Sequence, residues 1–163
     1  KYVKWFGGSR LVNNIPDDNE TTLPLRLWLQ LMKCTKAIEG EMAGRFRRRH
    51  NQSLSRFDLL SQLYRIEEEW APIGEVAAMV MASSGNITGL VDRMQADGLV
   101  ERRANPIDRR SFQVRMTDQG RIAFLDMTGD HAKWAAGALR GISDHDKEQL
   151  IKLLVRVRRA FEV

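Results

Sequence analysis

The chain of 163 residues contains little of several residue types that define common classes of protein. It has one cysteine, so no internal disulfide framework can form, and a single thiol is typical of a reducing cytoplasm. Its three histidines are far apart in the sequence, and none has a partner at zinc-ligand spacing. No apolar run approaches the roughly 20 residues that a membrane-spanning helix needs. We therefore expect no metal site and no membrane segment.

The signatures of several common enzymes are also missing. The sequence contains no glycine-rich loop that would hold phosphates and no nucleophile elbow of the G-x-S-x-G type. No pair of cysteines is present for redox chemistry. We therefore expect a protein that is not an enzyme, with no catalytic residues and no cofactor.

The charge of the chain is modestly basic overall but strongly clustered. The formal net charge is +5, a balance that favours a polyanionic partner. Five arginines lie within residues 99–115, where only two acidic residues accompany them. Smaller basic groups lie within residues 45–49 and 152–159, whereas the acidic run at 67–69 stands apart. The dense group is the best candidate for contact with an anionic polymer.

The spacing of apolar residues predicts a mainly helical chain. One short amphipathic helix ends at the stop signal Gly98, and a second short helix precedes it after a brief gap, which is the outline of a helix-turn-helix. The apolar stripe of the later helix consists of Ile87, Leu90, Val91 and Met94. The residues expected to begin the successive helices are Thr21 or Thr22, Ser55, Pro72, Ser83, Thr117 and Ser143.

Two short strands are expected after Gly98, at residues 99–103 and 111–116. In the second strand Phe112, Val114 and Met116 alternate with polar residues, so we expect these three side chains on the inward face. A charged turn joins the two strands. A helix-turn-helix followed by such a hairpin is a winged helix-turn-helix, which places a helix in one groove of DNA and the hairpin beside it.

These patterns divide the chain into three parts. Residues 53–117 are expected to form the winged helix-turn-helix domain. Residues 21–52 and 118–163 are expected to form a helical dimerisation region, because their wide apolar faces need partner surfaces. Residues 1–20 read as an N-terminal arm, which either packs on a neighbouring surface or is a partly ordered tail. The predicted fold class is mainly α, with a small two- or three-stranded β-wing.

Five blocks of sequence form a recognisable pattern. They are LSRFDLL at 54–60, GNITGLVDRM at 85–94, GLVERR at 98–103, NPIDRRS at 105–111 and MTDQG at 116–120. Taken together these blocks resemble the MarR family of bacterial transcriptional regulators, and the flanking helices agree with that family in layout rather than in motif.

The resemblance implies a homodimer that binds double-stranded DNA at a pseudo-palindromic operator, most often as a repressor. It also implies a cytoplasmic location at the nucleoid. In the family the first and last helices interlock to form the dimer. Many relatives release DNA when a small phenolic, lipophilic or acyl-thioester ligand enters a cleft between the two regions, so a small aromatic or acyl-thioester effector is expected.

The residues expected to contact DNA lie off the apolar stripe of the recognition helix and at the tip of the hairpin. Hydroxyl and amide groups can bond to base edges or phosphates, and arginine suits a narrow minor groove. Asp108 would repel phosphate, so we expect it to pair with an arginine and hold the turn; the family pattern favours Arg110 for this role. The alternative is a solvated helix face beside a charged turn. The candidate residues are Ser84, Gly85, Asn86, Thr88, Gly89 and Arg93 on the helix, and Asp108, Arg109 and Arg110 on the wing.

The resemblance also assigns an effector cleft and a dimer interface. The cleft residues are either ligand contacts or plain core, and they are Trp28, Met32, Phe57, Met127 and His131. The candidate interface residues are Leu27, Leu31, Leu150, Leu154, Val157 and Phe161. Cys34 is either an oxidant sensor, as in hydroperoxide-sensing relatives, or a small core residue. The basic residues 47–50 either touch an anionic ligand or DNA, or form a solvated helix end.

Two other functions remain open on the sequence. One is a non-specific architectural protein that coats DNA. The other is a ligand-binding dimer that has kept the fold without binding DNA, against which the arginines of the wing argue.

Overall fold

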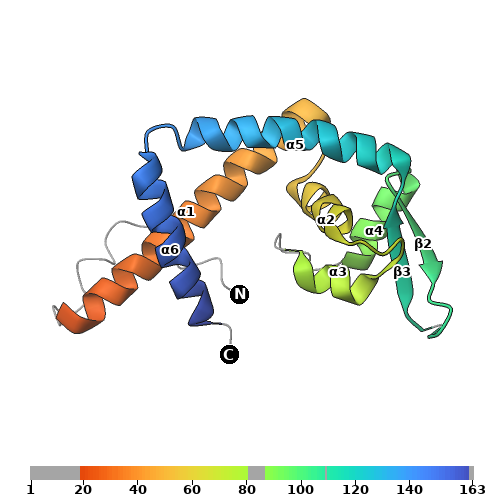
Figure 1. The fold of residues 1–163 in the computed structure, drawn as a ribbon, viewed down its shortest axis with the longest axis horizontal. Coiled ribbons are helices and arrows are strands. Elements are labelled where there is room, and N and C mark those ends of the chain that lie inside the picture. The colour runs from red at the N-terminus through yellow and green to blue at the C-terminus, as the bar shows by residue number, and fades with distance from the viewer. Residues whose placement is uncertain (1–18, 81–86, 109, 162–163) are drawn as a thin grey trace. The chain divides into compact units, whose positions relative to one another are not determined.

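The computed structural model describes residues 19–80, 87–108 and 110–161. The chain divides into two compact units, the first ending at Glu41 and the second beginning at Met42. The predicted class, mainly helical with a small sheet, is confirmed. The elements of the described residues are α1 (Asn19–His50), α2 (Leu54–Arg65), β1 (Ala71–Pro72), α3 (Ile73–Met79), α4 (Ile87–Ala96), β2 (Val100–Ala104), β3 (Phe112–Met116), α5 (Asp118–Ala138) and α6 (Asp144–Arg159) (Figure 1).

The start of α1 differs from the prediction. The helix begins at Asn19, so Thr21 and Thr22 lie inside its first turns and are not its caps. Pro24 also lies inside the helix, where its missing N–H removes one bond from the backbone ladder. The cause of the difference is that helical geometry extends back to Asn19, two residues before the first threonine.

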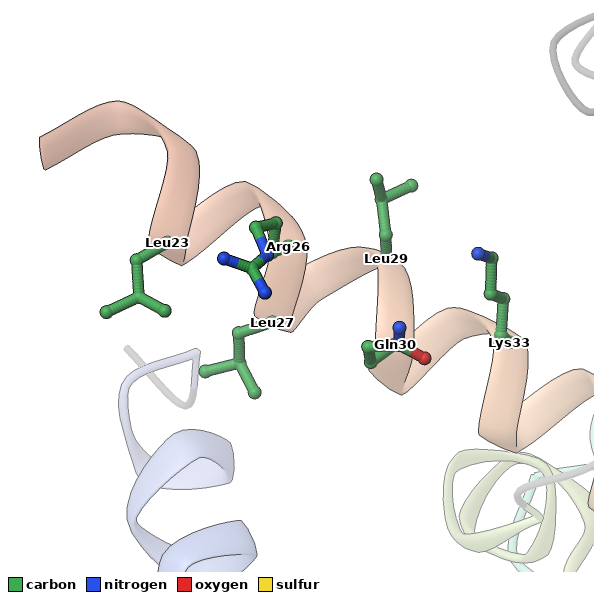
Figure 2. A pocket seen from close by; sticks show the side chains of 6 residues that line it. All are labelled: Leu23, Arg26, Leu27, Leu29, Gln30 and Lys33. Atoms are coloured by element: carbon green, nitrogen blue, oxygen red, sulfur yellow. The ribbon is translucent and has the colours of Figure 1, made fainter. Parts of the chain in front are cut away.

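In the first unit, α1 exposes apolar side chains to solvent. Leu23, Leu27, Trp28 and Met32 are all exposed there. Figure 2 shows side chains of this helix around an open hollow of about 340 Å³, and the described residues that line the hollow all belong to α1. Cys34 is also exposed, so the expectation of a small core residue at this position is wrong.

The N-cap of helix α2 lies two residues earlier than predicted. The hydroxyl of Ser53 accepts a hydrogen bond of 3.2 Å from the backbone N–H of Arg56, and Ser53 has the extended backbone that a cap needs. Ser55 lies inside the first turn and is not the cap. Thr117 and Ser143 cap α5 and α6 as predicted, because each hydroxyl accepts a backbone N–H of the first turn.

The three strands form one antiparallel sheet in the order β1-β3-β2. Val100 pairs with Met116 and Ala104 with Phe112, while Ala71 of β1 pairs with Val114. The sheet thus has the third strand that the sequence left open, and this strand precedes α3. The positive φ of 72° at Gly98 closes α4 and directs the chain into β2, as predicted for a glycine at this position.

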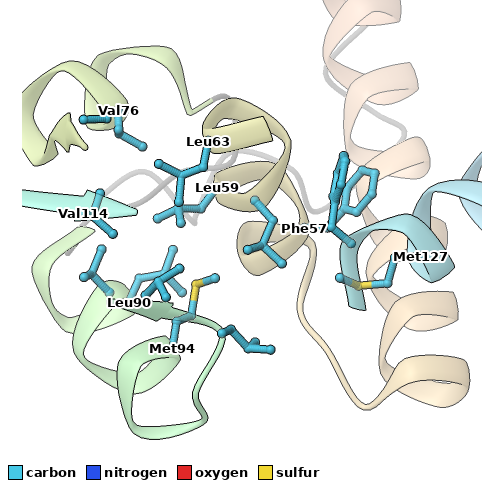
Figure 3. Close-up of a cluster of buried hydrophobic side chains, with 14 of the residues drawn as sticks. Phe57, Leu59, Leu63, Val76, Leu90, Met94, Val114 and Met127 are labelled. Atoms are coloured by element: carbon cyan, nitrogen blue, oxygen red, sulfur yellow. The ribbon is translucent and has the colours of Figure 1, made fainter. Parts of the chain in front are cut away.

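The core of the second unit lies between α2, α3, α4 and the sheet, and it continues onto α5 (Figure 3). Leu59, Val76 and Val114 are completely buried at its centre. Phe57 of α2 and Met127 of α5 extend the core between these two helices. Phe112 follows the predicted alternation but is not part of the core, since it is 40% exposed at the far end of β3.

The C-terminal helix α6 contributes nothing to this core, because none of its residues is buried. Apolar side chains nonetheless cover much of its surface. Among the helices of the described residues, none combines the length and the hydropathy needed to cross a membrane.

Candidate DNA-binding surface

Helix α4 has one face in the core and one face in solvent. Leu90, Val91 and Met94 are buried, as the stripe predicted. Thr88 and Arg93 are exposed, whereas Gly89 is half-buried. A hydroxyl and a guanidinium are therefore free to meet a ligand on this helix. The candidates Ser84, Gly85 and Asn86, and the predicted cap Ser83, lie outside the described residues.

An ion pair joins the exposed face of α4 to strand β2. The Nη1 atom of Arg102 lies 2.6 Å from Oδ1 of Asp92. The same guanidinium stacks on the ring of Phe112, with its central carbon 3.7 Å from the ring centroid. Sequence reasoning did not single out these three residues as a group, because their contact depends on how helix and hairpin pack together.

The tip of the β2–β3 hairpin is held by short-range hydrogen bonds. The side chain of Asn105 accepts from the backbone N–H of Ile107, and that of Asp108 accepts from the backbone N–H of Arg110, each at 3.0 Å. Ser111 donates both its hydroxyl and its backbone N–H to the carbonyl of Asp108. Asp108 thus shapes the turn through the backbone of Arg110. The side chain of Arg110 is exposed, and Arg109 lies outside the described residues.

A further arginine of the hairpin, Arg115, is bound to acidic side chains. Arg115 pairs with Glu69 and, at 2.8 Å, with Glu101, its register partner across the hairpin. The hydrogen bond that Arg115 donates to Glu101, opposed by partial burial and assisted by the charges of Glu101 and Glu69, raises the pKa of Arg115. This arginine therefore forms part of the scaffold.

The ring of Trp70 organises the same face of the sheet. The guanidinium of Arg103 lies 4.1 Å from its centroid and that of Arg115 lies 4.8 Å from it. Arg103 also donates to the amide oxygen of Gln113 at 2.9 Å. Sequence reasoning missed Trp70 and treated the acidic run as separate from the arginines. The signal that could have linked them is the position of Glu69 and Trp70 directly before a strand of the same sheet.

An open hollow of about 450 Å³ lies where the N-terminus of α3, α4 and the hairpin meet. Thr88, Ser111 and Arg110 line it together with the ion-paired Arg102, so two hydroxyls and two guanidiniums lie at one space. Glu75 of α3 lies at the same hollow and places a negative charge there. The donors suit phosphate or sugar oxygens of a nucleic acid backbone.

Two residues at the basic end of α1, Arg49 and His50, contact acidic side chains of α5. Arg49 bonds to Asp130 of α5 at 3.3 Å. His50 lies 3.2 Å from both Asp126 and Asp130, although its contact with Asp130 is not aligned as a hydrogen bond. Partial burial opposes ionisation of Asp130, but Arg49, through its hydrogen bond and charge, lowers the pKa of that carboxyl overall. This end therefore joins α1 to α5.

The candidate cleft residues fall into two groups. Trp28 and Met32 are exposed on α1 in the first unit. Phe57 and Met127 are buried in the core of the second unit, and the ring of His131 lies 4.9 Å from that of Phe57 and 5.8 Å from that of Phe46. Burial lowers the pKa of His131. The structure thus brings three of the five candidates together.

The candidate interface residues are not used by the core of the single chain. Leu27, Leu150, Leu154 and Phe161 are exposed, and Leu31 and Val157 are half-buried. In the part of the chain that the structure describes, no group of three or more histidine, cysteine or acidic side chains could hold a metal ion.

Comparison with known proteins gives a consistent set of relatives. Residues 53–112 match the MarR family. The HTH-type transcriptional regulator MhqR of Bacillus subtilis is 26% identical over 137 residues, which cover 84% of this chain and 92% of MhqR.

Two solved structures share the fold. One is the organohalide-sensing transcriptional regulator RdhR in its 2,4-dichlorophenol-bound form, with a TM-score of 0.75, 18% identity and coverage of 90% of this chain and 86% of that one. The other is Sco3205 of Streptomyces coelicolor, a MarR family transcriptional regulator in complex with DNA, with a TM-score of 0.73, 16% identity and coverage of 83% and 84%.

The match at residues 53–112 coincides with the segment that carries the ion-paired helix and hairpin. The relatives named above are regulators of transcription and not enzymes. Helix-turn-helix, wing, matched segment and relatives all agree: residues 53–112 carry a MarR-family domain, and the chain is similar to transcriptional regulators of that family.

Proposed function

We propose that this protein is a sequence-specific repressor that binds a pseudo-palindromic operator as a homodimer. Residues 53–117 bind DNA, and residues 21–52 and 118–163 form the dimerisation region. The phosphates supply most of the affinity through basic side chains, and the recognition helix supplies the choice of sequence. This activity belongs in the cytoplasm, at the nucleoid.

The observation that carries the proposal is the placement of α4 beside the hairpin. Thr88 of α4 and Arg110 of the hairpin line one hollow, and an ion pair ties the two elements together. A helix and a hairpin that project from one side of a protein suit a major groove and the adjacent minor groove. The DNA complex of Sco3205, which shares this fold, gives the proposal further support.

The test begins with DNA fragments selected by the purified protein from a genomic library. Footprinting on the selected fragments should reveal a protected palindrome with half-sites about one helical turn apart. Uniform coating without a preferred site would favour a non-specific architectural protein. Absence of any salt-dependent binding would favour a ligand-binding dimer without DNA activity.

The role of Arg110 can be measured on such a fragment. Each phosphate contact contributes about 0.9 to the slope of log K against log salt concentration, so Arg110→Ala should lower that slope by about one unit. Arg140→Ala, which removes an exposed arginine after α5, is the matched control and should leave the slope unchanged. Equal slopes for Arg110→Ala and wild type would remove Arg110 from the DNA contacts.

A small aromatic or acyl-thioester effector is proposed to control release of the DNA. RdhR, which shares the fold, has been solved with 2,4-dichlorophenol. The ring of His131 of α5 lies 4.9 Å from that of Phe57 of α2, so a ligand here would touch both elements. A thermal-shift screen of phenols, aromatic acids and their thioesters should find compounds that raise the melting temperature and weaken DNA binding.

A further inference from the structure

The ion pair between Arg102 and Asp92 differs from an ordinary surface contact. Arg102 lies on β2 opposite Val114, so it emerges from the face of the sheet that packs on the helices. Its side chain is only 20% exposed, and its Nε atom is buried without a hydrogen-bond partner. The guanidinium is therefore confined between a carboxylate of α4 and the ring of Phe112.

This geometry requires an arginine. A planar guanidinium can stack on an aromatic ring and still direct an N–H at a carboxylate, which the rounded ammonium of lysine does less well. The exposed phenyl ring of Phe112, which the core does not cover, is thereby explained as the platform for Arg102. Arg110, by contrast, has an exposed side chain.

Asp92 is otherwise an unfavourable residue at its position. It lies on the exposed side of α4, next to Arg93, where a carboxylate would repel approaching phosphates. Pairing with Arg102 offsets that charge. The carboxylate of Asp92 would therefore serve a role other than attracting DNA.

The two elements that the pair joins must contact different grooves at once. A hairpin that moved freely relative to α4 would lose conformational freedom on binding, and that loss would weaken the complex. A fixed spacing removes this cost without any new contact to DNA.

We propose that Arg102 is a positioning residue, locked by Asp92 and Phe112, that sets the spacing between the recognition helix and the wing and does not itself contact DNA. This inference rests on the proposed DNA-binding function. It predicts that changes in the pair alter affinity and leave the number of phosphate contacts unchanged.

The decisive variant is Asp92→Ala, because the two explanations predict opposite signs. If charge alone mattered, removal of a carboxylate from this surface would tighten DNA binding. If the pair positions the wing, binding should weaken by a factor between about 3 and 100, the range of coupling energies for residues in direct contact. Glu75→Ala, which removes an exposed carboxylate from α3 at the same hollow, is the matched control and should bind DNA as tightly as wild type or more tightly.

Arg102→Ala and Arg102→Lys complete the experiment, measured on one selected fragment over a range of salt concentrations. Both should weaken binding, and both should keep the wild-type slope of log K against log salt concentration. The double variant Asp92→Ala/Arg102→Ala should be no weaker than Arg102→Ala alone, since each change breaks the same bond. Melting temperatures verify that every variant is folded.

Three outcomes would overturn the inference while leaving the proposed function intact. They are tighter or unchanged binding by Asp92→Ala, a slope lowered by about one unit in Arg102→Ala, and wild-type affinity in Arg102→Lys. Failure of the wild-type protein to bind any DNA would instead overturn the proposed function itself.

Discussion

At the scale of single residues, the arginines of the hairpin show that composition alone does not define a DNA-binding surface. Arg115 is held by Glu69 and Glu101, and Arg102 is held by Asp92. Arg103 stacks on Trp70. The cluster that points to an anionic partner is thus largely engaged in contacts within the protein, while Arg110 at the tip has an exposed side chain.

Gly120 should be among the least replaceable residues of the second unit. A Cβ atom there would lie 2.0 Å from the carbonyl oxygen of Leu99 and 3.1 Å from the side chain of Met116. Because the nearest neighbour is backbone that cannot rotate away, Gly120→Ala should lower the free energy of unfolding by roughly 1–3 kcal/mol. Urea denaturation at one protein concentration measures the change.

The matched control for this glycine lies on the same helix. A Cβ atom at Gly129 would meet nothing within 4 Å, so Gly129→Ala should stabilise α5 by roughly 0.5–1 kcal/mol through helix propensity. If both alanine variants change the free energy of unfolding in the same direction, that result would contradict the close packing of α5 on Leu99.

His131 should make the folded protein sensitive to mild acid. Burial against Phe46 and Phe57 lowers its pKa in the folded state below the ordinary value of 6.5. The unfolded chain therefore binds more protons than the folded chain in this range, so the free energy of unfolding should fall as the pH drops below about 6.5.

The variant His131→Gln isolates this effect, since all other titrating groups remain. The stability difference between wild type and variant should shift in the variant's favour between pH 7.5 and pH 5.5, as measured by urea denaturation at each pH. The lowered pKa of Asp130 acts in a separate window, with stability lost only as the pH falls below about 3.8. A difference that stays constant from pH 7.5 to 5.5 would mean that His131 titrates alike in both states.

At the scale of elements, the sequence was sufficient wherever one residue type settles the local geometry. The stripe of Leu90, Val91 and Met94 predicted which face of α4 is buried, and Gly98 predicted where the helix ends. Thr117 and Ser143 were identified as caps, and each hydroxyl accepts a backbone N–H of the first turn. These features depend on backbone geometry and periodicity, which are local.

The errors arose where several residues offered the same local signal, or where long-range packing determined whether a side chain is buried. Ser53 and Ser55 are both good caps, and only the extended backbone at Ser53 distinguishes them. Phe112 obeyed the alternation of its strand but lies beyond the core, so it pairs with Arg102 instead. The strand β1 has only two residues and no pattern of its own, and its pairing with β3 is a long-range contact.

The candidate site was predictable in part for the same reason. The turn at Asp108 could be anticipated from its sequence, since aspartate commonly accepts a nearby backbone N–H in a turn. The ion pair between Asp92 and Arg102 could not be anticipated, because it joins two elements whose separation no sequence pattern specifies.

At the scale of the whole molecule, we expect the apolar surface that the single chain leaves exposed to pack against a second copy of the chain. No residue of α6 is buried, yet Ile151, Leu153 and Leu154 are at least 40% exposed on it. Apolar patches of this kind on a regulator mark an interface, because leaving them in water favours association. A two-fold dimer would present two recognition helices to a palindromic site.

This expectation can be tested on α6 with two variants that introduce the same side chain. Leu154→Glu places a carboxylate in the apolar surface and should dissociate the dimer, because the charge would be desolvated at the interface without a partner. Lys152→Glu places it on the polar side of the same helix and should leave the dimer intact.

Sedimentation of both variants and of wild type, over a range of protein concentrations, measures the outcome. Loss of the dimer should also abolish tight operator binding, since one half-site alone gives up the second set of contacts. A Leu154→Glu protein that stays dimeric would place the interface on another surface, and a monomeric wild type that still protects a palindrome would mean that the two copies assemble only on DNA.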